Sequence, residues 1–526
     1  MNSRVVTKRI SRRHILTLIG GVCGASAASP KGIASSLVTT RSLVPKTLAT
    51  APNYWCTWAA QNYLYAQGTR EFDPIELEGA AGAVHAQTLL NERVLMRPDG
   101  WAKVFHPRIR QELYLLLDDG WQEGGTDTFQ LDRSKFPSFI GPAEQRLRDL
   151  NNAVRADGWR ALALWCRFPP DYSKGGERCV SWNKRAGIPY LKIDGGDQAG
   201  ILTRARAHQD ASITLEHIHG EPCLNGDWRR EGRFDTQIWG CMRLEILRKT
   251  DVYRTYDATA ILGIPTTLDR AVELLKGVSG HPEVAGILNV EDEVYLAAVL
   301  GCSMGVLRHP LRGLRPNNDE DVFFPATRQL KRRMDEVVRA VRWQRIAPPL
   351  AAGEGTLVLD SQRLVDEWTF KHGETFDPHV VGNRARQSAP ARVARNMELP
   401  SVSCKGDLPY VACTRFQNGA AAIGAFERVV DRAFQPKADV AWKVGDISGP
   451  FGIFGRFRSL TLIFDRQLRP GRVLAQDLAG DSPIDITDEV SVGSSEVTLP
   501  GALIDRIGRS SGTQGDLSMP GLVLAI

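Results

Sequence analysis

The sequence predicts an α/β fold, with a (β/α)8 TIM barrel over residues 51–350 and a C-terminal antiparallel β-sandwich domain over residues 351–526. Two observations favour this fold: short apolar runs alternate with helical patterns up to about residue 350, and that alternation stops there. A third is the composition of the 526 residues, 43% hydrophobic and 24% charged, which is ordinary for a globular protein with a large core.

Eight apolar runs in the first domain are the expected barrel strands. Helical patterns such as Glu144–Ala156, Leu268–Gly277 and Glu293–Leu300 separate them, which is typical of βαβ units and a parallel sheet. About eight such units in roughly 300 residues favour a closed barrel over an open sheet. The expected strands are Tyr54–Trp58, Leu113–Leu117, Ala161–Cys166, Tyr190–Ile193, Ile213–Leu215, Val252–Tyr256, Val284–Val290 and Met304–Leu307.

The second domain has a different pattern. Short alternating runs, separated by Gly, Pro, Asp and Asn, are typical of an antiparallel sandwich. Residues 384–397 are rich in Arg and Ala, and we interpret them as a loop or linker. The expected strands include Thr356–Leu359, Leu460–Phe464, Val473–Gln476 and Val497–Leu499.

Residues 1–28 have the pattern of an export signal. Arg12 and Arg13 precede a short apolar stretch, and Ala25-Ser26-Ala27 is a small-residue cleavage site, as in twin-arginine signals. The apolar stretch, about 10–14 residues, is too short to span a bilayer. We therefore expect a periplasmic or secreted protein that has no membrane contact after cleavage, with residues 29–50 as an unstructured lead-in.

The net charge and the cysteine spacing limit which ligands and partners, such as nucleic acid or zinc, we expect. The net charge is +6, but several positive residues lie within the first 13, so no nucleic-acid partner is indicated. The nine cysteines have no zinc-binding spacing, although the eight that follow the signal permit disulfides. Cys166 lies inside an apolar run and is expected to be a buried thiol. We expect no metal and no cofactor.

Polar residues at the strand ends mark the expected site, because the active site of a (β/α)8 barrel lies at the carboxyl ends of its strands. Carboxylates can bind vicinal hydroxyls, aromatic rings can stack on a pyranose, and two further carboxylates can serve as nucleophile and acid/base. A single Asp after a strand is often only a helix N-cap, but here several strands in series carry one. These strand-end residues are Trp55, Trp58, Asp118, Asp119, Trp165, Asp194, Glu216, Asp251, Asp257, Glu291 and Asp292.

Three segments, Leu115–Trp121, Leu131–Phe139 and Leu191–Gly195, resemble the α-galactosidases of glycoside hydrolase families 27 and 36 in order and spacing. The resemblance covers roughly residues 52–345, and the family also carries a C-terminal β-domain. It implies a retaining glycosidase that cleaves terminal α-galactosides, with a carbohydrate substrate and no cofactor.

The resemblance also implies roles for single residues. Asp118 and Asp119 match the pair that binds the axial and primary hydroxyls of galactose, and Asp194 matches the catalytic nucleophile. Lys192 matches a sugar-binding lysine, and its position two residues before Asp194 puts both on one strand face, where the ammonium favours an ionised carboxylate. Further substrate contacts implied or expected at strand ends are Trp58, Trp165, Glu216 and Arg254.

The general acid/base is expected in strand six. The resemblance implies an Asp a few residues after Arg254, which is Asp257. Asp251 is the rival and lies on the same strand face, but Asp257 is nearer the carboxyl end. The odd spacing between Arg254 and Asp257 requires an irregular backbone there.

Strand five departs from the family pattern. It carries His217 and His219, whose spacing puts both rings on one strand face. They either reshape the pocket, form a metal pair, or are two hydrogen-bonding residues at the barrel mouth.

Three functions stay open. The first is an α-galactosidase, and the second is a hydrolase of β-L-arabinopyranosides or another α-glycoside on the same barrel. The third is a non-catalytic carbohydrate-binding protein, which the presence of both Asp194 and Asp257 disfavours. Kinase and esterase functions are excluded, because the sequence has neither a phosphate-binding Gly-rich loop nor a Ser nucleophile elbow.

Overall fold

The computed structural model describes residues 41–61, 84, 86–125, 128–167, 173–194, 200–218, 248–254, 263–310, 329–369, 384–468 and 471–526. Residues 41–526 form one compact unit. No helix within these described ranges is both long and apolar enough to cross a membrane. The predicted export signal and the first part of the lead-in lie outside the described residues.

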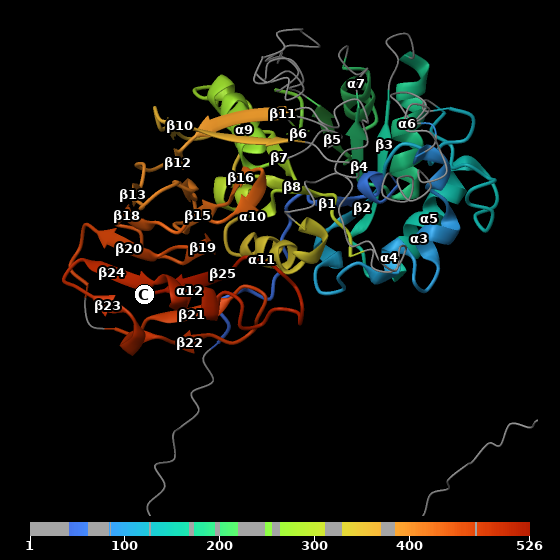
Figure 1. The fold of residues 1–526 in the computed structure, drawn as a ribbon. Helices are drawn as coiled ribbons and strands as arrows, with labels where there is room; N and C mark the ends of the chain where they lie inside the picture. Colours follow the sequence, from blue (N-terminus) through green and yellow to red (C-terminus); the bar gives the residue numbers. More distant parts are fainter. Residues whose placement is uncertain are drawn as a thin grey trace, which may run out of the picture. The chain divides into compact units, whose positions relative to one another are not determined.

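The predicted barrel is confirmed. Eight parallel strands close in chain order, and β1 pairs with both β2 and β8 (Figure 1). The strands are apolar runs because those of a parallel barrel are buried on both faces. Their bounds are β1 Tyr54–Cys56, β2 Tyr114–Leu117, β3 Ala161–Cys166, β4 Tyr190–Ile193, β5 Thr214–Ile218, β6 Val252–Arg254, β7 Ile287–Glu291 and β8 Ser303–Val306.

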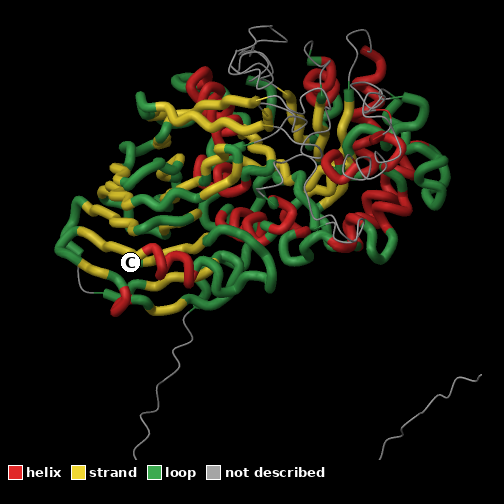
Figure 2. The backbone as a smooth tube through the Cα atoms, viewed as in Figure 1, coloured by secondary structure: helices red, strands yellow, loops and turns green. Residues whose placement is uncertain are grey.

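Helices follow the strands and cover the barrel, as the red segments of Figure 2 show. In α5 the residues Leu147, Leu150 and Val154 recur at helical spacing and are buried, while the opposite face is polar. The three expected helices are present as α5 Ala143–Ala156, α9 Ile264–Val278 and α10 Val294–Leu300. Other helices of the described residues are α3 Glu92–Met96, α4 Trp101–Val104, α6 Ser173–Ala186, α7 Ile201–His208, α11 Asp335–Trp343 and α12 Gly501–Ile507.

The C-terminal β-domain is also confirmed. Its strands form three sheets, in the orders β11-β10-β16-β17, β22-β21-β25-β19-β15-β14-β12-β9 and β13-β18-β20-β24-β23. Most pairs are antiparallel, but β10–β16, β12–β14, β15–β19 and β18–β20 are parallel. The bounds are β9 Leu357–Leu359, β10 Arg363–Thr369, β11 Arg384–Pro390, β12 Arg392–Arg395, β13 Ser401–Ser403, β14 Tyr410–Arg415, β15 Ala421–Phe426, β16 Arg428–Val430, β17 Arg432–Phe434, β18 Asp439–Gly445, β19 Phe451–Gly455, β20 Ser459–Phe464, β21 Leu474–Asp477, β22 Ile484–Asp485, β23 Ser491–Val492, β24 Glu496–Pro500 and β25 Gly521–Ala525.

One sequence-based prediction, a loop or linker over residues 384–397, is wrong. Residues 384–397 form strands β11 and β12, because their arginines have partners at the strand edges: Arg395 donates to the Leu300 carbonyl at 2.9 Å. Residues 41–50, expected to be unstructured, contain no helix or strand but are anchored. The Leu43 amide donates to Gln476 at 2.7 Å, and the Ala49 amide donates to Glu112 at 2.9 Å.

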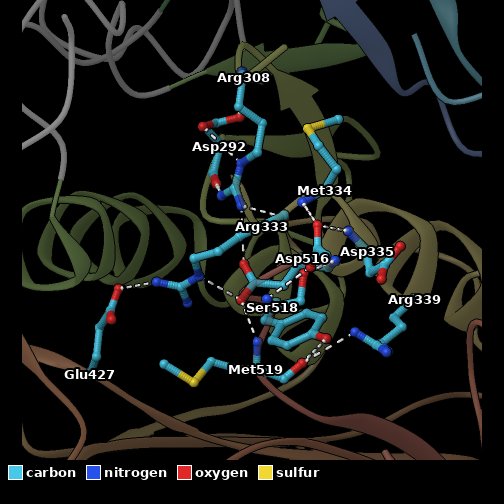
Figure 3. A network of polar contacts seen from close by, with 12 residues as sticks. Asp292, Arg308, Arg333, Met334, Asp335, Arg339, Glu427, Asp516, Ser518 and Met519 are labelled. Atoms are coloured by element: carbon cyan, nitrogen blue, oxygen red, sulfur yellow. Dashed lines mark hydrogen bonds and ion pairs between the residues drawn. The ribbon is translucent and has the colours of Figure 1, made fainter. Parts of the chain in front are cut away.

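A buried chain of ion pairs joins the end of β7 to the β-domain (Figure 3). Arg308 lies 3.1 Å from Asp292 and 3.0 Å from Glu336, and Arg333 lies 2.8 Å from Glu336. Arg333 also lies 2.8 Å from Glu427, between β15 and β16. Buried ion pairs of this kind fix geometry, because each charge needs its partner.

Candidate active site

Lys192 occupies the interior of the barrel near the carboxyl ends of the strands. Its ammonium lies 2.8 Å from an Asp118 carboxylate oxygen, and the Cys56 thiol donates to the same oxygen at 3.0 Å. Burial, followed by the charge of Asp118, raises the pKa of Cys56 well above its usual value, so this thiol stays a donor. The Asp118 amide donates to Thr57 at 2.9 Å. Residues from β1, β2 and β4 thus converge on one carboxylate.

Asp194 follows β4 and is the accessible carboxylate of this group. Its side chain is 32% exposed, and the Trp165 indole N–H donates to it at 3.3 Å. The Arg254 guanidinium lies 3.7 Å from its other oxygen. The Asp194 amide donates to the Cys166 carbonyl at 2.9 Å, which fixes the backbone where the strand ends. A partly exposed carboxylate held by a cation and an N–H donor can act as a nucleophile.

Arg254 lies in a buried polar layer beneath Asp194. Its Nε is 2.8 Å from Glu216 and its Nη1 is 3.8 Å from Glu291. The Tyr54 hydroxyl donates to both of these carboxylates at 3.2 Å, and the Tyr190 hydroxyl also donates to Glu216. Burial raises the pKa of Glu216, while the charge of Arg254 opposes that rise. The layer fixes the guanidinium in place.

This burial changes the expected roles of three residues. Sequence reasoning gave Lys192, Glu216 and Arg254 direct contacts with the sugar. Each is fully buried and bound to protein groups, because side chains fill the barrel interior below the strand ends. In the described structure they fix Asp118 and Asp194 instead.

Asp119 lies at the turn that follows β2. The Gln87 side-chain amide donates to its carboxylate at 2.7 Å. Burial raises the pKa of Asp119 to about 6, against the lowering effect of that hydrogen bond. The charge of Asp119 is therefore expected to change near pH 6.

The rival acid/base Asp251 lies at the wrong end of the barrel. It precedes β6, pairs with Arg206 and accepts the Leu215 amide at 2.8 Å. Since Asp194 follows β4, the two carboxylates flank opposite ends of parallel strands. Asp257, the preferred acid/base, lies outside the described residues.

His217 points away from the buried layer. It neighbours the inward-facing Glu216 on β5, and its Nδ1 is 3.0 Å from the Thr250 hydroxyl. His217 therefore faces away from the barrel interior that holds Lys192 and Arg254, because successive side chains of a strand face opposite sides. His219 lies outside the described residues. Within the part of the chain that is described, no group of three or more His, Cys, Asp or Glu side chains is arranged to hold a metal.

Sequence reasoning missed the partners on the inner face of β1 and β4. It singled out Trp55, which packs outward with Trp101, Phe105 and His309. The available signal was strand parity: if Trp55 faces out, then Tyr54 and Cys56 face in. The same parity places Tyr190 on the face of Lys192.

Comparisons with known proteins add little to this geometry. No protein-family model and no curated protein matches the chain. The carboxyl transferase domain of Rhizobium etli pyruvate carboxylase with 3-bromopyruvate is similar over 60% of this chain and 55% of its own, at 14% identity and a TM-score of 0.25. This chain thus spans about half the length of that solved structure.

The catalytic domain of the GH30 xylanase C from Talaromyces cellulolyticus is similar over 92% of this chain and 98% of its own, at 9% identity and a TM-score of 0.25. At these TM-scores neither similarity bears on activity. The case for a function therefore rests on the site residues.

Proposed function

We propose that this protein is a retaining glycoside hydrolase that cleaves terminal α-galactosides. The observation that supports this most strongly is the environment of Asp194. It is a partly exposed carboxylate at the end of a barrel strand, held by Trp165 and by the buried Arg254. Two residues earlier on the same strand, the buried Lys192 pairs with a second carboxylate, Asp118.

The proposed mechanism uses two carboxyl groups. The Asp194 carboxylate attacks the anomeric carbon while Asp257 protonates the departing glycosidic oxygen, which leaves a glycosyl ester on Asp194. Asp257 then takes a proton from water, and the resulting attack on the anomeric carbon releases the sugar and regenerates Asp194. Two inversions give net retention of configuration.

The proposed sugar contacts are Asp118, Asp119, Trp58 and Trp165. Two adjacent carboxylates can accept hydrogen bonds from neighbouring hydroxyls, and an indole ring can stack on the apolar face of a pyranose. Lys192, Arg254 and Glu216 are proposed to act from below, by fixing the charges and positions of Asp118 and Asp194. A matching arrangement serves β-L-arabinopyranosides, which have the same ring hydroxyl pattern.

A panel of nitrophenyl glycosides tests this proposal. We expect turnover of the α-D-galactopyranoside, with the α-anomer of galactose as the first product in the NMR spectrum. The Asp194→Asn variant should lose at least about a thousandfold in rate, whereas Asp251→Asn, at the other end of the barrel, should retain activity. Turnover of no glycoside, or first release of the β-anomer, would contradict the proposal.

We further propose that residues 1–28 direct export to the periplasm or the medium. Fractionation of cells that express the full chain, followed by N-terminal sequencing of the mature protein, tests this. Cytoplasmic protein with an intact N-terminus would contradict it.

A further inference from the structure

The turn that carries Asp119 is held from its outer side by three side chains from separate segments. Gln61 donates from its side-chain amide to the Asp119 carbonyl at 2.8 Å. Gln87 donates to the Asp119 carboxylate at 2.7 Å. Lys135 donates to the Gly120 carbonyl at 2.6 Å and to the Gln87 carbonyl at 2.9 Å. The turn and Gln87 are thus tied to each other and to the same ammonium.

Gly120 makes this close approach possible. Its φ is +114°, and a Cβ at this position would lie 2.6 Å from the Gln87 carbonyl oxygen and 2.7 Å from the Gln87 Cα. Any larger residue would push the backbone of Gln87 away from the turn. The backbone of residue 120 therefore sets the distance over which Gln87 reaches Asp119.

Lys135 is presented by the segment that begins at Asp132. The Asp132 carboxylate accepts the amides of Ser134 at 2.8 Å and of Lys135 at 3.1 Å, which closes a tight turn. Phe136, next in the chain, is buried and anchors that turn in the core. This stretch lies within Leu131–Phe139, one of the three segments that carry the family resemblance, and the proposed mechanism gives it no role.

We propose that Gln87 and Lys135 are positioning residues that hold the Asp119 carboxylate ionised and aimed at the substrate. Gln87 supplies the donor, and Lys135 fixes both Gln87 and the turn while adding a positive charge nearby. Removing either leaves a half-buried carboxylate with weaker support, which then takes up a proton more readily. This inference deepens the proposed function and rests on it for the identity of the ligand.

A titration of the free protein tests the inference without any substrate. Aspartate labelled with carbon-13 at the carboxyl carbon reports the protonation of Asp119, whose signal is assigned by its loss in Asp119→Asn. In Gln87→Leu, and to a smaller extent in Lys135→Met, the titration midpoint of Asp119 should move up by about one pH unit. Gln145→Leu is the matched control, because Gln145 makes a similar side-chain contact, with Asp149 on α5. In Gln145→Leu the titration midpoint of Asp119 should not move.

Galactose binding measured by calorimetry between pH 5 and 8 gives the second readout. In the wild type, affinity should fall below about pH 6, where Asp119 becomes protonated, and in Gln87→Leu the fall should begin about one unit higher. An unchanged Asp119 midpoint in folded Gln87→Leu and Lys135→Met proteins would overturn the inference. A shifted midpoint in a protein that binds no galactose at any pH would support the inference and contradict the proposed function.

Discussion

Replacing Arg254 by Met should destabilise the fold in a pH-dependent way. The guanidinium is fully buried, lies 2.8 Å from Glu216 and approaches Asp194 and Glu291. Removing one partner of a buried ion pair typically costs about 3–5 kcal/mol, because the other charge stays desolvated. We expect a loss of that size in the free energy of unfolding at pH 8.

The pH dependence follows from Glu216. Burial already raises its pKa in the folded state, and Arg254 is the main group that opposes the rise, so the variant raises that pKa further. A carboxyl group whose folded pKa is raised gives its full stability below the unfolded pKa and loses it as the pH rises through the folded pKa. The deficit of Arg254→Met should therefore shrink by about 1.4 kcal/mol for each pH unit between the folded pKa of Glu216 in the variant and its lower folded pKa in the wild type. Below the wild-type value both proteins gain stability equally, and the deficit stays constant.

Urea unfolding at pH 5 and pH 8, followed by tryptophan fluorescence, measures both effects. Adding Glu216→Gln to Arg254→Met should recover a large part of the loss at pH 8, because the orphaned charge is gone. Arg206→Met is the control: its partner Asp251 is 41% exposed, so the loss should be below about 1 kcal/mol. Equal losses for Arg254→Met at both pH values, with no relief from Glu216→Gln, would refute the reasoning.

Three further predictions follow from the same contacts. Asp119→Asn should lower kcat/KM and remove the acidic limb of its pH profile near pH 6. The reason is that the folded-state pKa of Asp119 is about 6, and protonation below that value costs a sugar contact. An acidic limb that persists in the variant would belong to another group. Trp165→Phe removes the N–H that donates to Asp194 and should lower kcat by about tenfold with little change in KM, as steady-state kinetics would show, and an unchanged kcat would remove Trp165 from the site. Arg333→Met leaves Glu336 and Glu427 without the partner that they share, and should lower the free energy of unfolding, measured in urea, by about 3–5 kcal/mol. The control is Arg472→Met, which removes an exposed ion pair with Asp485 and should cost less than about 1 kcal/mol. Equal losses would contradict the role assigned to the buried chain of ion pairs.

The barrel was predictable because its strands are nearly continuous apolar runs. The run Ala161–Cys166 matches β3 at both ends, and the run Tyr190–Ile193 matches β4. The consecutive strands β11 and β12 were not predictable in the same way. From the sequence, arginines in this segment are expected to face solvent. The Leu300 carbonyl, which accepts a hydrogen bond from Arg395, is distant in the chain and comes close only in the folded protein.

The candidate site was predictable as far as strand position determines it. The position of Lys192 is predicted by its place in the fourth strand, and that of Asp194 by its place directly after that strand. Lys192 has two partners, Cys56 and Asp118, which come from two other strands. No local sequence pattern links them to Lys192. Gln87 reaches Asp119 from a helical turn 32 residues earlier in the chain, so a hydrogen bond between them could not be inferred from spacing.

Trapping the glycosyl ester tests the central claim most directly. A fluorinated galactosyl substrate that forms the ester quickly and hydrolyses slowly should inactivate the protein and add one fluorosugar to its mass. Peptide mapping should place that mass on Asp194, and Asp194→Asn should acquire none. A label on any other residue, or an unlabelled protein that still hydrolyses the α-galactoside, would contradict the assignment of Asp194 as the nucleophile.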